Sequence, residues 1–560
     1  MRVLKTGRGR RLTRLVALCA VVGLVVTACA PAEDPEEALQ DAEDDADADD
    51  AADTDDATDD ATDDDAGEDA AGDIADDERF TIAVGVDFDT FDPAGTTTTT
   101  VGNMVTYMVE TLTRIDEDGE VLPQLATDWV ISDDGLTYTL SLVEDATFHD
   151  GTPFNADAVV YTMDRVRDPE VEVPIRAAFE VIESVTAVDE YTVEIVLGEP
   201  FPPLLAALSF EGGAIISPES VEAEGNSYTD YTRPVGTGPY VYGEYNAGEN
   251  FQVSRYDDYW GELPYYSDVT FQIVPESATR VSLLRAGQAD MIILPPISDL
   301  PALEESPDTE LLLAPGNRAI FMAINTNTIT DERVRQAMNL AVDRQSIIDN
   351  VLFGAADPVV APMHESLVGY CSVRDLEYDP DRARELLAEA GAEDLEIDFI
   401  APTGRYIQDA EVAQAVSGFL EEVGISVNFE TMDWPTYVGR ITAEADAQEQ
   451  DVHLLGWAPS YLDAFQHMVI FQADQAPPNG LGTSFYDNSE VDELLASAAV
   501  EVDEDARQQL YCDASEIIFD ESPHIFMYSQ RFPIAYSAEV TNVSYRPNES
   551  FYAIYARPAS

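Results

Sequence analysis

The chain has 560 residues, which is too long for a single hydrophobic core and long enough for two or three. Its 110 Asp and Glu against 28 Lys and Arg give a formal net charge of −82. This charge excludes nucleic acid as a partner, because binding to phosphates requires a basic face.

Residues 1–28 are predicted to be an export signal. Basic residues precede an apolar run from Leu15 to Val26, which is too short to cross a bilayer comfortably. The run is followed by Thr27, Ala28 and Cys29, which resemble the lipobox of bacterial lipoproteins. We therefore expect a lipid on Cys29 that anchors the protein to the outer face of the cell membrane, or to its periplasmic side if an outer membrane exists. The alternative is an ordinary signal peptide with an incidental cysteine.

Residues 29–78 are predicted to form an acidic, disordered tether. Pro31–Glu78 contains 25 acids, no Lys or Arg and no aromatic residue. Such a segment cannot bury enough apolar surface to fold, and its charges repel one another and extend it. The tether would link Cys29 to the folded body.

The remaining residues, 79–560, keep 85 acids against 22 arginines and no lysine, a net charge of about −63. Repulsion of this size is tolerable when salt screens it. The composition therefore predicts a halophilic, acidic surface. Codon bias in a GC-rich genome is an alternative for the missing lysines, but it would not add acids.

Short apolar strands alternate with amphipathic helices along the folded body, a pattern typical of α/β layers. Strands are predicted at 79–84, 130–132, 136–142, 251–254, 269–274, 319–325, 425–429 and 452–455. Helices are predicted at 156–166, 278–286, 331–352, 380–390 and 410–423.

The strand at 452–455 leads into a segment with the composition of a pocket wall. It breaks at Gly456 and Pro459, which continue a central strand poorly. Aromatic and polar side chains follow within a few residues, as expected at the end of a buried strand that borders a ligand.

Several motifs together resemble family 5, the peptide/nickel-type solute-binding proteins of ABC transporters. The first is LPQLATDWVISDDGLTYTLSLVEDATFHDGTPFNADAVVYTMDRV at 122–166. GTGPY at 236–240 is followed by RYDDYWG at 255–261, and VRQA at 334–337 by AVDR at 341–344. The resemblance covers nearly all of 79–555.

This resemblance implies an α/β fold of the two-lobed periplasmic-binding-protein type II, with an additional domain in the N-terminal lobe. Hinge strands would lie at 319–325 and 525–529. The implied boundaries are 79–124 for the first part of lobe one, 125–217 for the extra domain, 218–316 for the second part of lobe one, 317–527 for lobe two and 528–560 for the return to lobe one.

The implied function is capture of a peptide or peptide-like solute between the lobes and its delivery to ABC permease subunits, by a monomer without a cofactor. There are two alternatives. The protein could bind a sugar or other neutral solute, or it could be a ligand-sensing subunit of the same fold. An enzyme is not expected, because the sequence lacks a nucleophile–base or metal-binding motif, so no catalytic or metal-binding residue is predicted.

The resemblance also assigns ligand-binding roles. Backbone pairing with a peptide falls on Gly456, Trp457 and Ala458, and across the cleft on Thr97, Thr98 and Thr99. Peptide-binding relatives place an Asp for the ligand's α-amino group where this chain has Ser460, so a peptide would require Asp463 instead. The remaining candidates for contact with the ligand are Tyr461, Phe465 and Trp434, with core packing as the equal alternative for Trp434.

Two cysteines remain after loss of the signal and lipidation of Cys29. Cys371 and Cys512 would face an oxidising exterior and are expected to form a disulfide, with two buried thiols as the alternative. His467 lies near the predicted cleft, where it either faces the ligand or is a satisfied structural histidine.

Overall fold

A computed structural model describes residues 74–75, 77–96, 98–171, 173–226 and 231–559. Ala71–Ser560 form one compact unit. The predicted signal, Cys29 and almost all of the predicted tether lie outside the described residues. Within the described part of the chain, no helix is long and apolar enough to cross a membrane.

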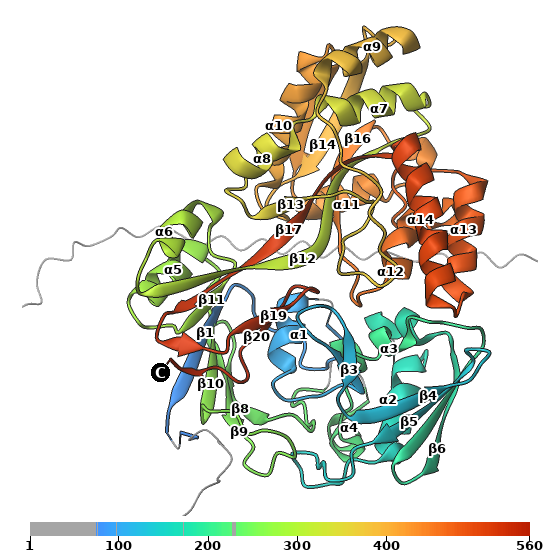
Figure 1. Cartoon of the computed structure of the whole chain (residues 1–560). Helices are drawn as coiled ribbons and strands as arrows, with labels where there is room; N and C mark the ends of the chain where they lie inside the picture. Colours follow the sequence, from blue (N-terminus) through green and yellow to red (C-terminus); the bar gives the residue numbers. More distant parts are fainter. Residues whose placement is uncertain (1–73, 76, 97, 172, 227–230, 560) are drawn as a thin grey trace, which may run out of the picture. The chain divides into compact units, whose positions relative to one another are not determined.

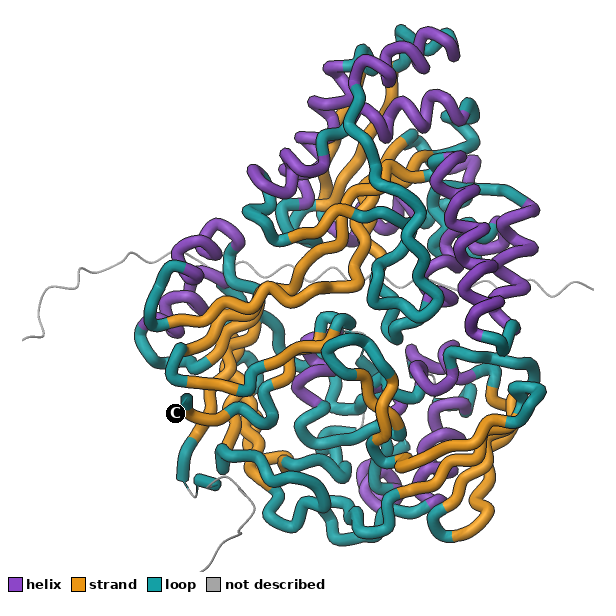
Figure 2. Tube along the Cα trace, in the orientation of Figure 1, coloured by secondary structure: helices purple, strands orange, loops and turns teal. Residues whose placement is uncertain are grey.

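One large mixed sheet runs through this unit (Figure 1, Figure 2). Its neighbouring strands, in spatial order, are β15 (Ser426–Met432), β14 (Glu396–Pro402), β16 (Val452–Trp457), β12 (Thr309–Ile324), β17 (His524–Ser537), β11 (Met291–Ile293), β1 (Arg79–Val84), β10 (Asp268–Ile273), β9 (Asn250–Arg255) and β8 (Tyr240–Asn246), and β13 (Ala356–Pro358) pairs with β17. The strands are parallel around β1 and around β14, and antiparallel elsewhere.

The long strands β12 and β17 carry the chain from one half of the sheet to the other (Figure 1). They pair antiparallel from Thr309 opposite Ser537 to Ala323 opposite His524, with register shifts between Ala314 and Arg318 and between Ile320 and Phe321. Of the predicted hinge segments, 319–325 falls on β12 except for its last residue, and 525–529 falls on β17. Gly316 lies at the first shift, where a Cβ would stand 2.3 Å from the carbonyl oxygen of Gln530.

Helices cover the half of the sheet around β14. They are α7 (Glu332–Ala341), α8 (Arg344–Asn350), α9 (Pro380–Ala390), α10 (Asp409–Glu422), α11 (Trp434–Ile441), α12 (Ala464–Met468), α13 (Ser489–Val500) and α14 (Glu504–Glu521). The single helix predicted at 331–352 is wrong: it is interrupted after Ala341, and Asp343 caps α8 by accepting a hydrogen bond from the Ser346 amide. A disulfide joins Cys371 to Cys512 of α14, as expected, with the Cα atoms 5.3 Å apart.

The half around β1 has its own core. Its helices are α1 (Thr99–Val105), α5 (Ser277–Arg285) and α6 (Leu300–Glu304), and the short hairpins β19 (Ser544–Arg546) with β20 (Ser550–Tyr552) and β18 (Val540–Thr541) with β21 (Arg557–Pro558) complete it. Phe551 and Ile554 pack in the same cluster as Phe80 of β1, so the end of the chain returns to the half in which the described chain begins.

A third core lies under a four-stranded antiparallel sheet. This sheet has the order β4 (Ala126–Ile131), β5 (Thr137–Leu142), β7 (Thr192–Leu197) and β6 (Ile182–Asp189), and the helices of this region are α2 (Ala156–Arg167), α3 (Leu204–Ala207) and α4 (Pro218–Glu224). The Asn155 side chain caps α2 by accepting a hydrogen bond from the Ala158 amide at 3.2 Å. A small hairpin of β2 (Thr113–Ile115) and β3 (Val121–Pro123) precedes this sheet.

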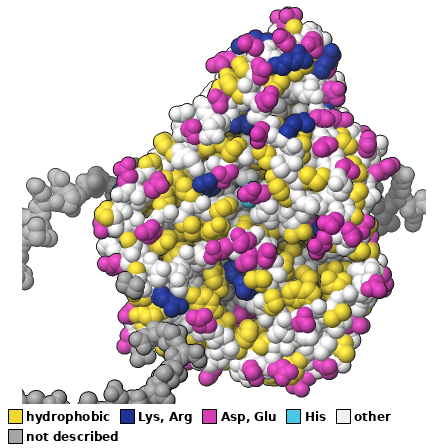
Figure 3. All heavy atoms as spheres, viewed as in Figure 1, with side chains coloured by type: hydrophobic (Ala, Val, Ile, Leu, Met, Phe, Trp, Pro, Cys, Tyr) yellow, Lys and Arg dark blue, Asp and Glu magenta, His cyan; other side chains and the backbone are white. Residues whose placement is uncertain are grey.

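Acidic side chains are spread over the face of the molecule shown in Figure 3, with few basic ones among them. Where arginines are exposed, they commonly pair with an acid close by, as Arg382 does with Glu385 and Glu389. Such exposed pairs contribute little to stability individually.

Candidate functional site

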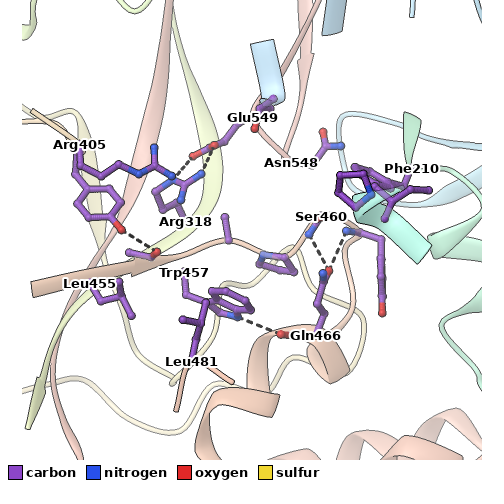
Figure 4. A pocket seen from close by; sticks show the side chains of 18 of the residues that line it. Phe210, Arg318, Arg405, Leu455, Trp457, Ser460, Gln466, Leu481, Asn548 and Glu549 are labelled. Atoms are coloured by element: carbon purple, nitrogen blue, oxygen red, sulfur yellow. Dashed lines mark hydrogen bonds and ion pairs between the residues drawn. The ribbon is translucent and has the colours of Figure 1, made fainter. Parts of the chain in front are cut away.

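A cavity of about 510 Å³ lies at the end of β16 (Figure 4). One wall comes from β16 and the loop after it, from α11 and from the loop after β14. The opposite wall comes from Thr96, Thr99 and two short 3₁₀ segments, 174–179 and 211–213. Arg318 of β12 and residues 548 and 549 of the C-terminal hairpin complete it.

The last residues of β16 present a strand edge to this cavity. β16 pairs with β12 up to Trp457 on one side, but with β14 only at Val452 and His453 on the other. Beyond that point no described strand covers the second edge. Gly456 is required there, because a Cβ would stand 2.7 Å from both Ile320 Cδ1 and the Tyr406 ring. Because no described strand covers this edge, an extended ligand can approach it closely.

Gln466 of α12 fixes the loop that follows β16. Its side-chain oxygen accepts hydrogen bonds from the Ser460 amide at 2.7 Å and the Tyr461 amide at 3.3 Å, and its carbonyl accepts from Trp457 Nε1 at 3.1 Å (Figure 4). Asn317 donates to the Pro459 carbonyl at 2.8 Å. The loop is thus held before any ligand binds, which lowers the entropic cost of binding.

The two arginines on the cavity wall, Arg318 and Arg405, differ in whether an acid pairs with them. Arg318 makes two hydrogen bonds to Glu549, at 2.8 and 2.7 Å. The Arg405 guanidinium instead lies over aromatic rings, 5.1 Å from the Trp434 centroid and 5.3 Å from that of Tyr406. Among the described residues no carboxylate pairs with Arg405, so its charge is available to an anionic ligand group.

Glu211 is the acid on the opposite wall. Burial raises the pKa of its carboxyl to about 7, and the charge of Arg546 lowers it by less. Gly102 of α1 makes room for this side chain, because a Cβ there would stand 2.3 Å from Glu211 Oε1. No described residue forms an ion pair with Glu211, so a cationic ligand group would stabilise its charged form.

Most of the sequence-predicted binding residues meet at this cavity. Those that line it are Thr99, Trp434, Gly456, Trp457, Ala458, Ser460 and Tyr461. Trp434 also packs against two hydrophobic clusters, as its core-packing alternative expects, and its contact with a ligand stays a prediction. Thr97 lies outside the described residues, and Thr98 does not line the cavity; its hydroxyl donates to Asp89 at 3.2 Å.

Asp463 is placed elsewhere, contrary to its predicted role. Its carboxylate is 2% exposed and is bound by Arg507 of α14 at 2.6 and 2.9 Å. It also caps α12 by accepting from the Phe465 amide at 2.8 Å. Asp463 does not line the cavity, and its charge is already neutralised, so it cannot replace the missing acid at Ser460.

His467 is a structural histidine. It is fully buried, and its Nε2 lies 2.9 Å from the Pro362 carbonyl, to which it donates. Burial lowers its pKa to about 4, so it is neutral at physiological pH. Phe465 stacks edge-on against Phe201, with ring centroids 5.4 Å apart, and belongs to the third core rather than to the cavity.

Comparison with known proteins gives consistent results. The profile described as bacterial extracellular solute-binding proteins, family 5, middle part, matches residues 120–478. Glutathione-binding protein GsiB of Escherichia coli K12 is 30% identical over 479 residues, which cover 84% of this chain and 92% of GsiB. GsiB of Pectobacterium atrosepticum is 31% identical over the same lengths.

Solved structures share the fold. HbpA2 of Haemophilus parasuis has a TM-score of 0.77 at 25% identity and covers 86% of this chain and 100% of its own. A second structure is the ABC transporter-associated periplasmic binding protein DppA of Helicobacter pylori in complex with the peptide STSA. It has a TM-score of 0.70 at 25% identity, and the match covers 85% of this chain and 98% of DppA.

Proposed function

Because the chain belongs to family 5 of the bacterial extracellular solute-binding proteins, we propose that it captures a peptide or peptide-like solute in the cavity at the end of β16. Delivery to the permease subunits of an ABC importer is part of the proposal, as is anchoring by a lipid on Cys29. The names of GsiB and of DppA with its bound peptide support this substrate class.

The observation that carries the proposal is the uncovered edge of β16 beside the cavity. An extended peptide adds to such an edge through main-chain hydrogen bonds, which do not depend on its sequence. The volume of about 510 Å³ lies within the range of small-ligand sites and favours a short peptide.

Two charged groups give the cavity the polarity of a free peptide. Arg405, without an acid partner in the described residues, would bind the α-carboxylate. Glu211 would bind the α-ammonium in place of the Asp that the family motif has at Ser460. Both groups lie on the cavity wall, and a charge-assisted hydrogen bond is stronger than one between neutral groups.

The lobes are assigned with the boundaries 79–124, 125–217, 218–316, 317–527 and 528–560, with β12 and β17 as hinge strands. Closure of two lobes on a solute is a hinge motion, and the ligand shifts the population towards the closed form. The protein is proposed to act as a monomer.

Calorimetric titration of the folded body tests the proposal. Ala-Ala-Ala is the probe, with N-acetylated and C-amidated forms as matched controls. We expect the free peptide to bind, each cap to weaken binding, and Arg405→Gln to remove the difference between acid and amide. Each lost charge contact should cost roughly 1.5–3 kcal/mol. Equal binding of all three peptides, or binding of neutral sugars in their place, would contradict the assignment.

A further inference from the structure

A second cavity, of about 470 Å³, lies beside the first. Glu211 and Asn548 line both cavities, so these two side chains form the boundary between them. The other walls come from the segment after α1, from the β2–β3 hairpin, from the loop at 259–262 and from the β19–β20 hairpin. None of the ligand-binding residues predicted from the sequence lines it.

Two arginines line this second cavity. Arg546 of β19 donates from Nε to the Ile115 carbonyl, and its guanidinium lies 3.9 Å from the ring centroid of Tyr552. The side chain of Arg114 on β2 makes no hydrogen bond or ion pair with any described residue. The two cations lie near enough that Arg114, after burial, lowers the pKa of Arg546.

Three acids line this cavity together with the two arginines. Two of them, Glu110 and Glu262, are already engaged by other side chains, while Glu211 at the boundary has no ion-pair partner among the described residues and lies near enough to interact with Arg546. Glu110 accepts hydrogen bonds from Thr237, Tyr259, Trp260 and Gln124, at 2.8, 2.9, 2.9 and 3.3 Å. Glu262 pairs with Arg557 at 3.6 Å. Asp116, which attracts Arg546, accepts from the backbone amides of Asp118 and Glu120 and does not line the cavity.

The result is a cavity in which neither Arg114 nor Arg546 has an ion-pair partner among the described residues, and in which Glu211, once paired with a ligand ammonium, would leave both arginines free for an anion. Two like charges facing one partly buried space repel each other, and an anion between them relieves that repulsion. Arginine forks fit carboxylates with two parallel hydrogen bonds, and the aromatic side chains of Tyr552 and Trp260 line the same cavity.

We propose that the second cavity is an anion subsite for the acidic side chain of the ligand's N-terminal residue, held by Arg114 and Arg546. This inference rests on the proposed function. Glu211 at the boundary would take the α-ammonium, so the side chain of the same residue projects past Asn548 into the second cavity. The protein then selects peptides that begin with an acidic residue.

The test compares Glu-Ala-Ala with Gln-Ala-Ala, which has nearly the same shape and no side-chain charge. In calorimetry at fixed salt, the wild type should bind Glu-Ala-Ala about ten- to a hundredfold more tightly. Arg114→Gln should remove this preference and leave the affinity for Gln-Ala-Ala unchanged, whereas Arg114→Lys should keep part of it. Arg285→Gln, an exposed arginine on α5 away from both cavities, is the matched control and should behave as the wild type.

Glutarate alone separates failure of the subsite from failure of the peptide proposal. Should neither peptide bind, glutarate binding that Arg114→Gln abolishes would still establish the anion subsite while refuting the peptide ligand. The subsite is overturned by an equal affinity for the two peptides, by a preference that survives both Arg114→Gln and Arg546→Gln, or by an absence of peptide and glutarate binding alike.

Discussion

At the scale of single residues, the site depends on Gly456, where the strand, the Tyr406 ring and the cavity meet. The Tyr406 hydroxyl donates to the Gly456 carbonyl at 3.3 Å, so the ring that a new Cβ would touch is itself held in place. The Arg405 guanidinium lies over that ring. A change at Gly456 therefore reaches the proposed carboxylate site as well as the strand edge.

Gly456→Ala is expected to lower the free energy of unfolding by about 1–3 kcal/mol, because the added methyl group overpacks the contact with Ile320 and Tyr406. Gly418→Ala is the matched control. Gly418 lies within α10 with open space around its Cβ position, so alanine should stabilise the helix by about 0.5–1 kcal/mol. Urea unfolding measures both, and a Gly456→Ala protein at least as stable as the wild type would count against the packing at Gly456.

If Glu211 binds the ligand's ammonium group, affinity should increase as the pH rises and Glu211 loses its proton. Burial raises its pKa to about 7, so below that pH the carboxyl is protonated and cannot pair with an ammonium. Affinity for Ala-Ala-Ala should rise between about pH 5.5 and 7, where the peptide's amino group remains charged. Glu211→Gln, or an N-acetylated peptide, should give a flat profile, and a wild-type profile that is flat as well would exclude Glu211 from the site.

The raised pKa of Glu211 makes the protein less stable, not more, as the pH rises over the same range. Glu211 holds its proton more tightly in the folded state than in the unfolded chain, where its pKa is near 4.5. Its contribution to the free energy of unfolding is therefore fully present below about pH 4.5 and is lost as the pH rises through about 7.

At the scale of elements, the short helix α12 organises one wall of the site. Gln466 on α12 holds the loop after β16, while Asp463 caps the helix and ties it to Arg507 of α14. The helix is too short to be stable alone, so its position depends on these polar contacts and on the packing around them.

Asp463→Asn should lower the free energy of unfolding by about 3–5 kcal/mol, because Arg507 is left buried without its partner. Asparagine still caps the helix, so the loss reports the ion pair. Asp520→Asn, which breaks an exposed pair with Arg374, should cost less than about 1 kcal/mol. Because Asp463 does not line the cavity, the folded variant should bind ligand as the wild type does. Weakened binding at unchanged stability would return Asp463 to the ligand site.

The sequence predicts the wall formed by one segment and misses what distant segments contribute. Residues 456–461 could be placed at the cavity because a strand end, a glycine and aromatic residues are adjacent in the chain. Arg405 and Glu211 join the site only through tertiary packing, and nothing in their local sequence marks them. Asp463 was misassigned for the same reason, because its partner Arg507 lies 44 residues away.

At the scale of the whole molecule, the stability of the fold depends on its net negative charge. A net charge of about −63 on the residues after the predicted tether favours expansion, and salt screens that repulsion. The midpoint of thermal unfolding should rise from low salt to molar NaCl. Sucrose at equal osmolality controls for stabilisation by solute exclusion. A midpoint that stays flat or falls in NaCl would mean that local pairs with arginine already compensate the acids.

The fold at this scale follows from the sequence more fully than the site does. Alternating strands and helices predict the α/β layers, and the ordered family motifs predict the halves joined by β12 and β17. The break after Ala341 was missed because the apolar stripe continues across it, whereas the backbone turns extended at Val342 and the Asp343 carboxylate caps the next helix.

The central claim is that the cavity at the end of β16 holds a peptide. Native mass spectrometry of the protein, purified from its host without denaturation, tests it most directly. We predict a co-purified mass that is released on unfolding and fragments as a short peptide, and that is reduced in Arg405→Gln. A bound sugar, or a peptide retained equally by Arg405→Gln and Glu211→Gln, would contradict this account of the site.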